Sequence, residues 1–138
     1  MQTQYEKVKV FREQVELPIS STPNLLSETD LLHHTQHLLK KITELIEANR
    51  TKDLNEVAEL TVDLVYLTMG MAHNMGLPFN ELFDAVHRSN LMKTKASEYA
   101  RALKGCEWDL NKPVSYVSAQ TALDGIGNIL ASAKASNC

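Results

Sequence analysis

One stretch, Asp53 to Gly76, constrains the fold of this chain more than any other part of the sequence. At about 100° per residue, its apolar side chains cover most of the circumference of a helix, and only a narrow stripe stays polar. A helix that is apolar on most sides is normally buried in a bundle. Carboxylates on such a helix need ion pairs, hydrogen bonds or a metal. The stripe carries three acids at spacings that place them on one face: Glu56, Glu59 and Asp63.

Helical periodicity also predicts helices on both sides of this stretch. In chain order, the expected helices cover residues 2–15, 28–49, 53–76, 78–93 and 97–103, with a weaker one over 118–135. Arg12 is expected on the outer side of the first helix, and Pro18 and Pro23 keep the following connection irregular. The short turn before Asp53 makes the second and third helices antiparallel neighbours.

Composition narrows the class of protein. The 138 residues suit one domain, few aromatic residues favour helices over sheet, and a net charge of −3 disfavours nucleic-acid binding. Two distant cysteines fit a reducing compartment rather than a disulfide framework or a cysteine zinc site. We find neither a signal peptide nor an apolar run of the roughly 18 to 20 residues that a membrane span needs. A soluble, cytoplasmic protein is expected.

Acids on the second helix form a candidate metal site with those on the third. Acids of the two helices could face each other across the short turn, and facing helices build sites for Mg²⁺ or Mn²⁺ in this way. Glu44 and Glu47 lie on the second helix, and on the third lie Glu56, Glu59 and Asp63. The alternative is a solvated helix face whose acids are neutralised by basic neighbours: Lys40, Lys41 and Arg50. Composition alone favours this alternative, least strongly for Asp63, which lies among apolar residues.

Three closely spaced histidines are candidate metal ligands. His33, His34 and His37 have spacings of three and four residues that can hold a transition metal, but no HExxH motif is present. We therefore interpret them as surface residues. His73 lies near the end of the apolar stretch and is interpreted as structural.

A basic and amide cluster follows at the end of the fourth helix. His87, Arg88, Asn90 and Lys93 could hold a phosphate and a base or ribose. The alternative is that basic residues complement the helix dipole, and the residues alone do not separate the two readings. No P-loop, GxGxxG, GxSxG or kinase signature is present.

These segments resemble a known group of proteins. The second helix, the run EANRTKDLNEVAELTVDLVYLTMGMAHNMGLPFNELFDAVHRSNLMK and the tail KGCEWDLNKP resemble the all-α nucleoside triphosphate pyrophosphohydrolases. Within these, they are most similar to MazG-like and phosphoribosyl-ATP pyrophosphohydrolase-like proteins. The segment VFREQVELPISSTPNLL resembles the start of one branch. The likeness covers about residues 5–113, and VHRSN…K is its most specific motif.

This resemblance implies an all-α, four- to five-helix bundle that forms a homodimer or a dimer of dimers. Residues 1–117 would form the domain, and 118–138 an additional helix packed on the domain or on a second subunit. The implied activity cleaves the α–β phosphate bond of a nucleotide with Mg²⁺ held by EExxE and ExxD motifs. Carried over by position, Glu44 and Asp63 match the last acids of EExxE and ExxD, and Asn90 and Lys93 match residues that contact substrate. The predicted metal ligands are Glu44, Glu47, Glu59 and Asp63, and all of these except Glu47 are also predicted to be catalytic. Lys41, His87 and Arg88 are predicted to bind substrate as well.

The sequence departs from the family pattern at several of these positions. The two leading acids of EExxE fall on Lys40 and Lys41, and the first acid of ExxD falls on Leu60, with Glu59 adjacent. The acid often found before the motif histidine falls on Ala85, with Asp84 beside it. Three hypotheses follow: an active hydrolase with an altered ligand set, a relative that binds a nucleotide or another phosphorylated metabolite without hydrolysis, and a purely oligomeric bundle.

Overall fold

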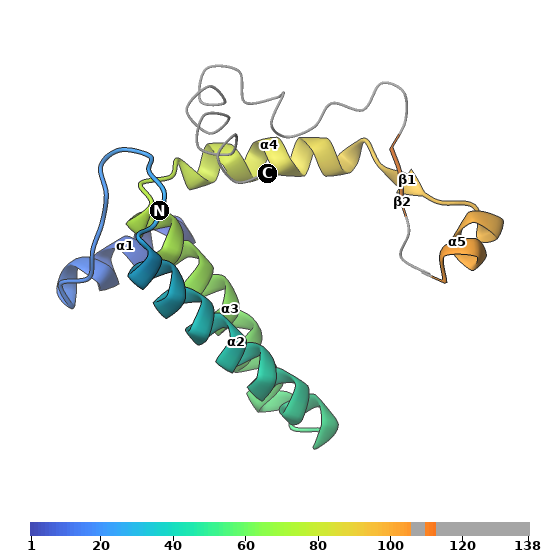
Figure 1. Ribbon diagram of the computed structural model, residues 1–138, viewed down its shortest axis with the longest axis horizontal. Helices are drawn as coiled ribbons and strands as arrows, with labels where there is room; N and C mark the ends of the chain where they lie inside the picture. Colours follow the sequence, from blue (N-terminus) through green and yellow to red (C-terminus); the bar gives the residue numbers. More distant parts are fainter. Residues whose placement is uncertain (106–109, 113–138) are drawn as a thin grey trace. The chain divides into compact units, whose positions relative to one another are not determined.

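The chain is all-α, as the sequence predicts. The computed structural model describes residues 1–105 and 110–112, and it divides the chain into two compact units (Figure 1). Unit 1 runs from Met1 to Phe79 and unit 2 from Asn80 to Cys138. Each is described by itself. No helix among the described residues is both long and apolar enough to cross a bilayer.

Unit 1 begins with helix α1, Gln4–Gln14, which starts at a capping box. The Thr3 hydroxyl accepts from the Glu6 backbone N–H at 3.2 Å, and the Glu6 carboxylate accepts from the Thr3 N–H at 2.6 Å. These two bonds satisfy backbone donors that the first turn of a helix leaves unpaired. The helix therefore starts two residues later than the sequence pattern indicates.

Helices α2, Glu28–Arg50, and α3, Leu54–Asn74, form the body of unit 1. Ser27 caps the first and Asp53 the second, each accepting a backbone N–H three residues on. The short turn at residues 51–53 reverses the chain, so the two helices run side by side and antiparallel (Figure 1). Both helices start within one residue of the predicted positions, and the hairpin is as predicted, but α3 ends at Asn74, two residues before its predicted end.

The start of α1 is fixed to the end of α3 by a ring contact and two hydrogen bonds. Tyr5 and His73 stack with ring centroids 3.6 Å apart. The Tyr5 hydroxyl donates to the Leu77 carbonyl at 2.8 Å, and His73 Nε2 lies 2.8 Å from the Tyr5 carbonyl. A carbonyl only accepts, so Nε2 carries the proton. The interpretation of His73 as structural is confirmed.

The connection between α1 and α2 is held against the C-terminal end of α3. The Ser20 N–H donates to the His73 carbonyl at 3.0 Å, and the Asn24 N–H to the Met75 carbonyl at 2.9 Å. Gly76 ends the helix with φ of 65°, a left-handed conformation that favours glycine. A Cβ at this position would overlap the Thr22 carbonyl oxygen.

Arg12 lies inside unit 1, so the expectation that it faces outward is wrong. Its side chain is 6% exposed, and both Nε and Nη2 donate to the Pro18 carbonyl, at 3.1 and 2.6 Å. The partner is a backbone oxygen of the irregular connection, which helical periodicity does not consider. This charge can be buried because a hydrogen-bonded guanidinium is far less costly than an unpaired one.

Within unit 1, the apolar circumference of α3 is buried on one side only. Leu60 is 1% exposed, whereas Val62 and Val65 are 64% and 52% exposed. Helices α1 and α2 cover only part of α3, so unit 1 by itself does not bury the helix all round. Apolar side chains of α2 are exposed as well: Leu31, Leu32, Leu39, Ile42 and Ile46.

Unit 2 begins with most of helix α4, Phe79–Leu91, followed by β1, Thr94–Lys95, α5, Glu98–Lys104, and β2, Leu110–Asn111. The two short strands pair antiparallel. Ser97 caps α5, and Gly105 ends it at φ of 61°. The helix expected over 118–135 and the segment around Trp108 lie outside the described residues.

Candidate functional site

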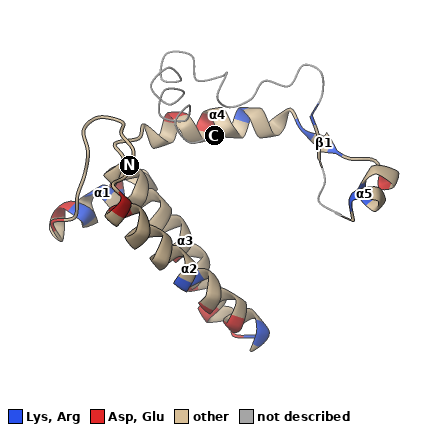
Figure 2. Cartoon of the chain, viewed as in Figure 1, with Lys and Arg blue, Asp and Glu red and all other residues tan. Residues whose placement is uncertain are grey.

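Charged residues of α2 and α3 gather toward the half of the hairpin that the turn closes (Figure 2). The helices are antiparallel, so residues before the turn on α2 lie opposite residues after it on α3. This register brings Lys41 of α2 to Asp63 of α3, 22 positions later in the sequence. All four predicted acids lie on this half: Glu44, Glu47, Glu59 and Asp63.

A lysine lies between two of the acids that the sequence assigned to a metal. Lys41 Nζ is 2.9 Å from Oδ2 of Asp63 and 3.6 Å from Oε2 of Glu44. Lys40 Nζ lies 3.8 Å from Oε1 of Glu44. The hydrogen bond with Asp63 raises the pKa of Lys41, so its ammonium stays charged at neutral pH. Two ammonium groups and two carboxylates give this cluster a net charge of zero.

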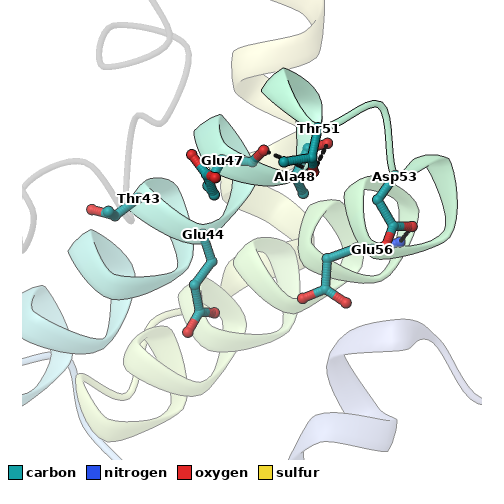
Figure 3. Close-up of a pocket in the computed structure, with 7 residues that line it drawn as sticks. All are labelled: Thr43, Glu44, Glu47, Ala48, Thr51, Asp53 and Glu56. Atoms are coloured by element: carbon teal, nitrogen blue, oxygen red, sulfur yellow. Dashed lines mark hydrogen bonds between the residues drawn. The ribbon is translucent and has the colours of Figure 1, made fainter.

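Next to this cluster, an acidic pocket of about 430 Å³ opens at the turn. Figure 3 shows the carboxylates of Glu44 and Glu56 pointing the same way, with Glu47 turned away from them. Glu47 instead accepts from Arg50 Nε at 2.8 Å, and this bond lowers its pKa. Asp53 caps α3. With Glu44 in contact with Lys40 and Lys41, three of the pocket's four carboxylates are thus already paired with other groups.

The remaining predicted ligand, Glu59, lies one helical turn before Asp63 on α3 and is exposed. Residues 1–105 and 110–112 contain no group of three or more histidine, cysteine or acidic side chains placed to hold a metal. Where the predicted magnesium ligands meet, an ammonium already contacts two of them. Mg²⁺ prefers an octahedron of oxygens, so this arrangement does not fit the ion.

The predicted substrate contacts lie on and after α4. His87, Arg88 and Asn90 are exposed, and Lys93 Nζ donates to Asn90 Oδ1 at 2.7 Å. Asn90 and Lys93, which the resemblance marks as substrate contacts, are therefore brought together. They belong to unit 2, and Lys41 belongs to unit 1.

The sequence profile of phosphoribosyl-ATP pyrophosphohydrolase matches residues 8–90. The match spans more than half of the 138 residues. The chain belongs to the phosphoribosyl-ATP pyrophosphohydrolase family. No curated protein matches the chain.

The phosphoribosyl-ATP pyrophosphohydrolase family acts on nucleotides. The main departure of this member from the family's metal-binding motifs is the pair of lysines on α2, Lys40 and Lys41. Lysines at the two leading acid positions of EExxE are visible in the sequence, but their partners are not, because the pairing depends on the hairpin register. Sequence reasoning missed Arg12 and Asn74 as candidate functional residues. Neither stands in a motif. Arg12 acquires its surroundings when α1 packs on the hairpin, and Asn74 meets His34 of α2 through the hairpin register.

Proposed function

We propose that this member of the phosphoribosyl-ATP pyrophosphohydrolase family binds the phosphate chain of a nucleotide at Lys41 without needing a divalent ion. The observation that carries the proposal is the Lys41 ammonium held between Asp63 and Glu44, at 2.9 and 3.6 Å. Family membership supports a nucleotide as the ligand. The position of Lys41 supports an ammonium group, in place of a metal ion, as the group that offsets the phosphate charge.

Charge balance supports binding without metal. Four acids around a phosphate chain would repel it, and a divalent ion then has to offset that repulsion. Here two lysines accompany Glu44 and Asp63, so the local charge is neutral before any ion arrives. An ammonium has three N–H donors. With two directed to carboxylates and the Lys41 side chain 31% exposed, the third can reach a phosphate oxygen.

A second candidate is the hydrolysis of the α–β phosphate bond with Mg²⁺ or Mn²⁺, which releases pyrophosphate. Family membership favours it, and Glu44, Glu47, Glu59 and Asp63 would be the metal ligands. In this case Lys41 has to leave Asp63 before an ion can bind there. The substrate-binding role of His87, Arg88, Asn90 and Lys93 is proposed for both candidates and rests on the motif VHRSN…K.

Calorimetric titration with ATP and with inorganic tripolyphosphate, in EDTA and then in Mg²⁺, tests the proposal. In EDTA, Lys41→Met should weaken the binding of both ligands about tenfold, because a hydrogen bond to a charged group contributes roughly 1.5–3 kcal/mol. Lys40→Met is the matched control, since that side chain is 72% exposed and contacts only Glu44 in the described part of the chain.

Each outcome of the titrations supports one of the three hypotheses and contradicts the other two. Binding in EDTA that depends on Lys41, without pyrophosphate release, supports the proposal. Binding and pyrophosphate release only with Mg²⁺, abolished by Asp63→Asn, identify the hydrolase and overturn the proposal. Binding of neither ligand in either buffer leaves the oligomeric bundle.

We also propose that two copies pair through the exposed apolar side chains of the hairpin. Leu32, Leu39 and Ile46 recur every seven residues on α2, and all three are more than half exposed. On α3, Val62 and Val65 are exposed to a similar extent. Large exposed apolar patches are uncommon on monomers, so this surface supports the homodimer that the resemblance implies.

A further inference from the structure

A second cleft, of about 340 Å³, lies among α1, α2 and α3 in unit 1. It contains no residue of the acidic pocket, and none of the motif residues of α4 line it. Its volume falls in the range of pockets that bind small molecules, about 300–1,000 Å³. Its lining mixes aromatic and aliphatic side chains with a few polar groups, the composition typical of such pockets.

The floor of this cleft holds a fixed cation, Arg12. The guanidinium is 6% exposed and two of its nitrogens donate to Pro18, so its position is set before any ligand arrives. Gly70 leaves room for it, since a Cβ there would lie 3.1 Å from Arg12 Nη1. Asp30 also lines the cleft, and its negative charge favours the charged form of Arg12.

Three imidazoles line one wall of the cleft. The rings of His33 and His37 lie with centroids 4.4 Å apart, and those of His33 and His34 6.0 Å apart. Asn74 Nδ2 lies 3.2 Å from His34 Nε2, which makes that ring nitrogen the acceptor. Burial lowers the pKa of His34 below 6.5, so this ring is neutral at pH 7. The wall therefore offers ring faces and hydrogen-bonding edges.

Two further aromatic rings line the cleft. Phe11 and Tyr66 meet edge to face, with centroids 5.8 Å apart. They are 43% and 37% exposed, so both rings keep surface that a ligand can cover. Flat aromatic surface beside a few directed polar groups suits a planar heterocycle, which stacks on rings and hydrogen-bonds through its edge.

We propose that this cleft binds the base of a nucleotide, stacked on the His33, His37 and Tyr66 rings, with its edge toward Arg12 and Asn74. The proposal rests on the phosphate site proposed at Lys41. The two sites are neighbours along the hairpin: His37 lies one helical turn before Lys41, and Tyr66 one turn after Asp63. A ribose can bridge that separation, so base and phosphates would occupy adjacent positions on one face.

The test separates the two halves of the ligand. The four common ribonucleosides, which lack phosphate, are titrated while the imidazole proton resonances are followed by NMR. At least one nucleoside should shift the His33, His34 and His37 signals and leave that of His73, which does not line the cleft, unchanged. Inorganic tripolyphosphate, which has no base, is titrated separately and reports on the phosphate site.

Two variants give an independent readout. Tyr66→Leu and His37→Ala should each weaken nucleoside binding about tenfold and leave tripolyphosphate binding unchanged, because base stacking contributes roughly 1–3 kcal/mol. Gln36→Ala, an exposed neighbour on α2, is the matched control.

The base site is overturned if no nucleoside moves the three cleft histidines, or if Tyr66→Leu weakens tripolyphosphate as much as nucleoside. A nucleoside response without tripolyphosphate binding keeps the base site and rejects the phosphate site. The two proposals therefore fail in distinguishable ways.

Discussion

The Lys41 ammonium nitrogen lies 2.9 Å from Oδ2 of Asp63, so a lysine of α2 neutralises an acid of α3 across the hairpin. In the family's metal-binding motifs, Asp63 matches the last acid of ExxD, and Lys41 stands where EExxE has its second acid. The ion pair therefore joins one retained and one replaced member of the same set. It explains how Asp63 can stay on an apolar helix without a metal.

Restoring the acid at this position should create a metal site. Lys41→Glu changes a positive charge to a negative one beside Glu44 and Asp63, and each pairwise interaction at about 4 Å is of order 1–4 kcal/mol. We expect Mn²⁺ affinity, followed by electron paramagnetic resonance, to rise at least about tenfold over the unmodified chain. Lys40→Glu makes the same charge change on a side chain that is 72% exposed, and should give a smaller gain. Equal gains would show that bulk charge, not this position, controls the ion.

Acid should destabilise unit 1 through His73. Burial lowers the pKa of His73 below 6.5, so the unfolded chain binds a proton more readily than the folded one. Stability then rises with pH: the contribution is full above 6.5 and is lost as the pH falls through the lowered folded pKa. Urea unfolding from about pH 7.5 to about pH 5 should be less pH-dependent in His73→Gln. His34 retains part of the dependence because burial lowers its pKa too. An unchanged slope in His73→Gln, compared with exposed His87→Gln, would contradict this assignment.

Gly76 should be far more sensitive to substitution than Gly105, although their φ values are alike at 65° and 61°. Among the described residues, Gly105→Ala meets no atom within 4 Å, so it should lose only the cost of a left-handed Ala, about 1–2 kcal/mol. Gly76→Ala adds the overlap with Thr22, which brings the expected loss to roughly 2–4 kcal/mol. Urea midpoints of the two variants measure the difference. Equal losses of stability in the two variants would mean that the connection between α1 and α2 moves away from the added Cβ at no energetic cost.

The pairing of two copies can be tested by charge. Val62→Lys places an ammonium on a side chain that is 64% exposed and should shift the chain from dimer to monomer in light scattering after size exclusion. Gln14→Lys, the control, places the same charge on an exposed residue at the end of α1, outside this set of α2 and α3 side chains. A dimer that survives the first variant and not the second would place the interface elsewhere.

The helices could be predicted from the sequence because capping residues, glycine and hydrophobic periodicity act over only a few residues. Ser27, Asp53 and Gly76 each mark a helix end by a cap or a left-handed residue, and the structure uses all three. The hairpin followed from the short turn between two periodic segments. These features depend on neighbours a few residues apart.

Long-range partners could not be predicted in the same way. Arg12 reads as an outer residue of an amphipathic helix until the Pro18 carbonyl accepts two of its donors. The sequence names Lys41 as a basic neighbour that could neutralise these acids, but only the register of the hairpin shows that its partner is Asp63. Which cation reaches which acid depends on that register.

The connection between α1 and α2 is attached to α3 at positions outside the cleft, so ligand selectivity could change without any change in the cleft lining. Ser20 and Asn24 hold residues 15–27 through backbone bonds, and that connection in turn presents the Pro18 carbonyl to Arg12. Neither of these two anchors lines the cleft. Substitutions at Ser20 or Asn24 would move the Pro18 carbonyl and with it the Arg12 guanidinium, while every residue that lines the cleft stays the same. Relatives with identical cleft walls could therefore prefer different ligands, and a comparison restricted to those walls would miss the cause.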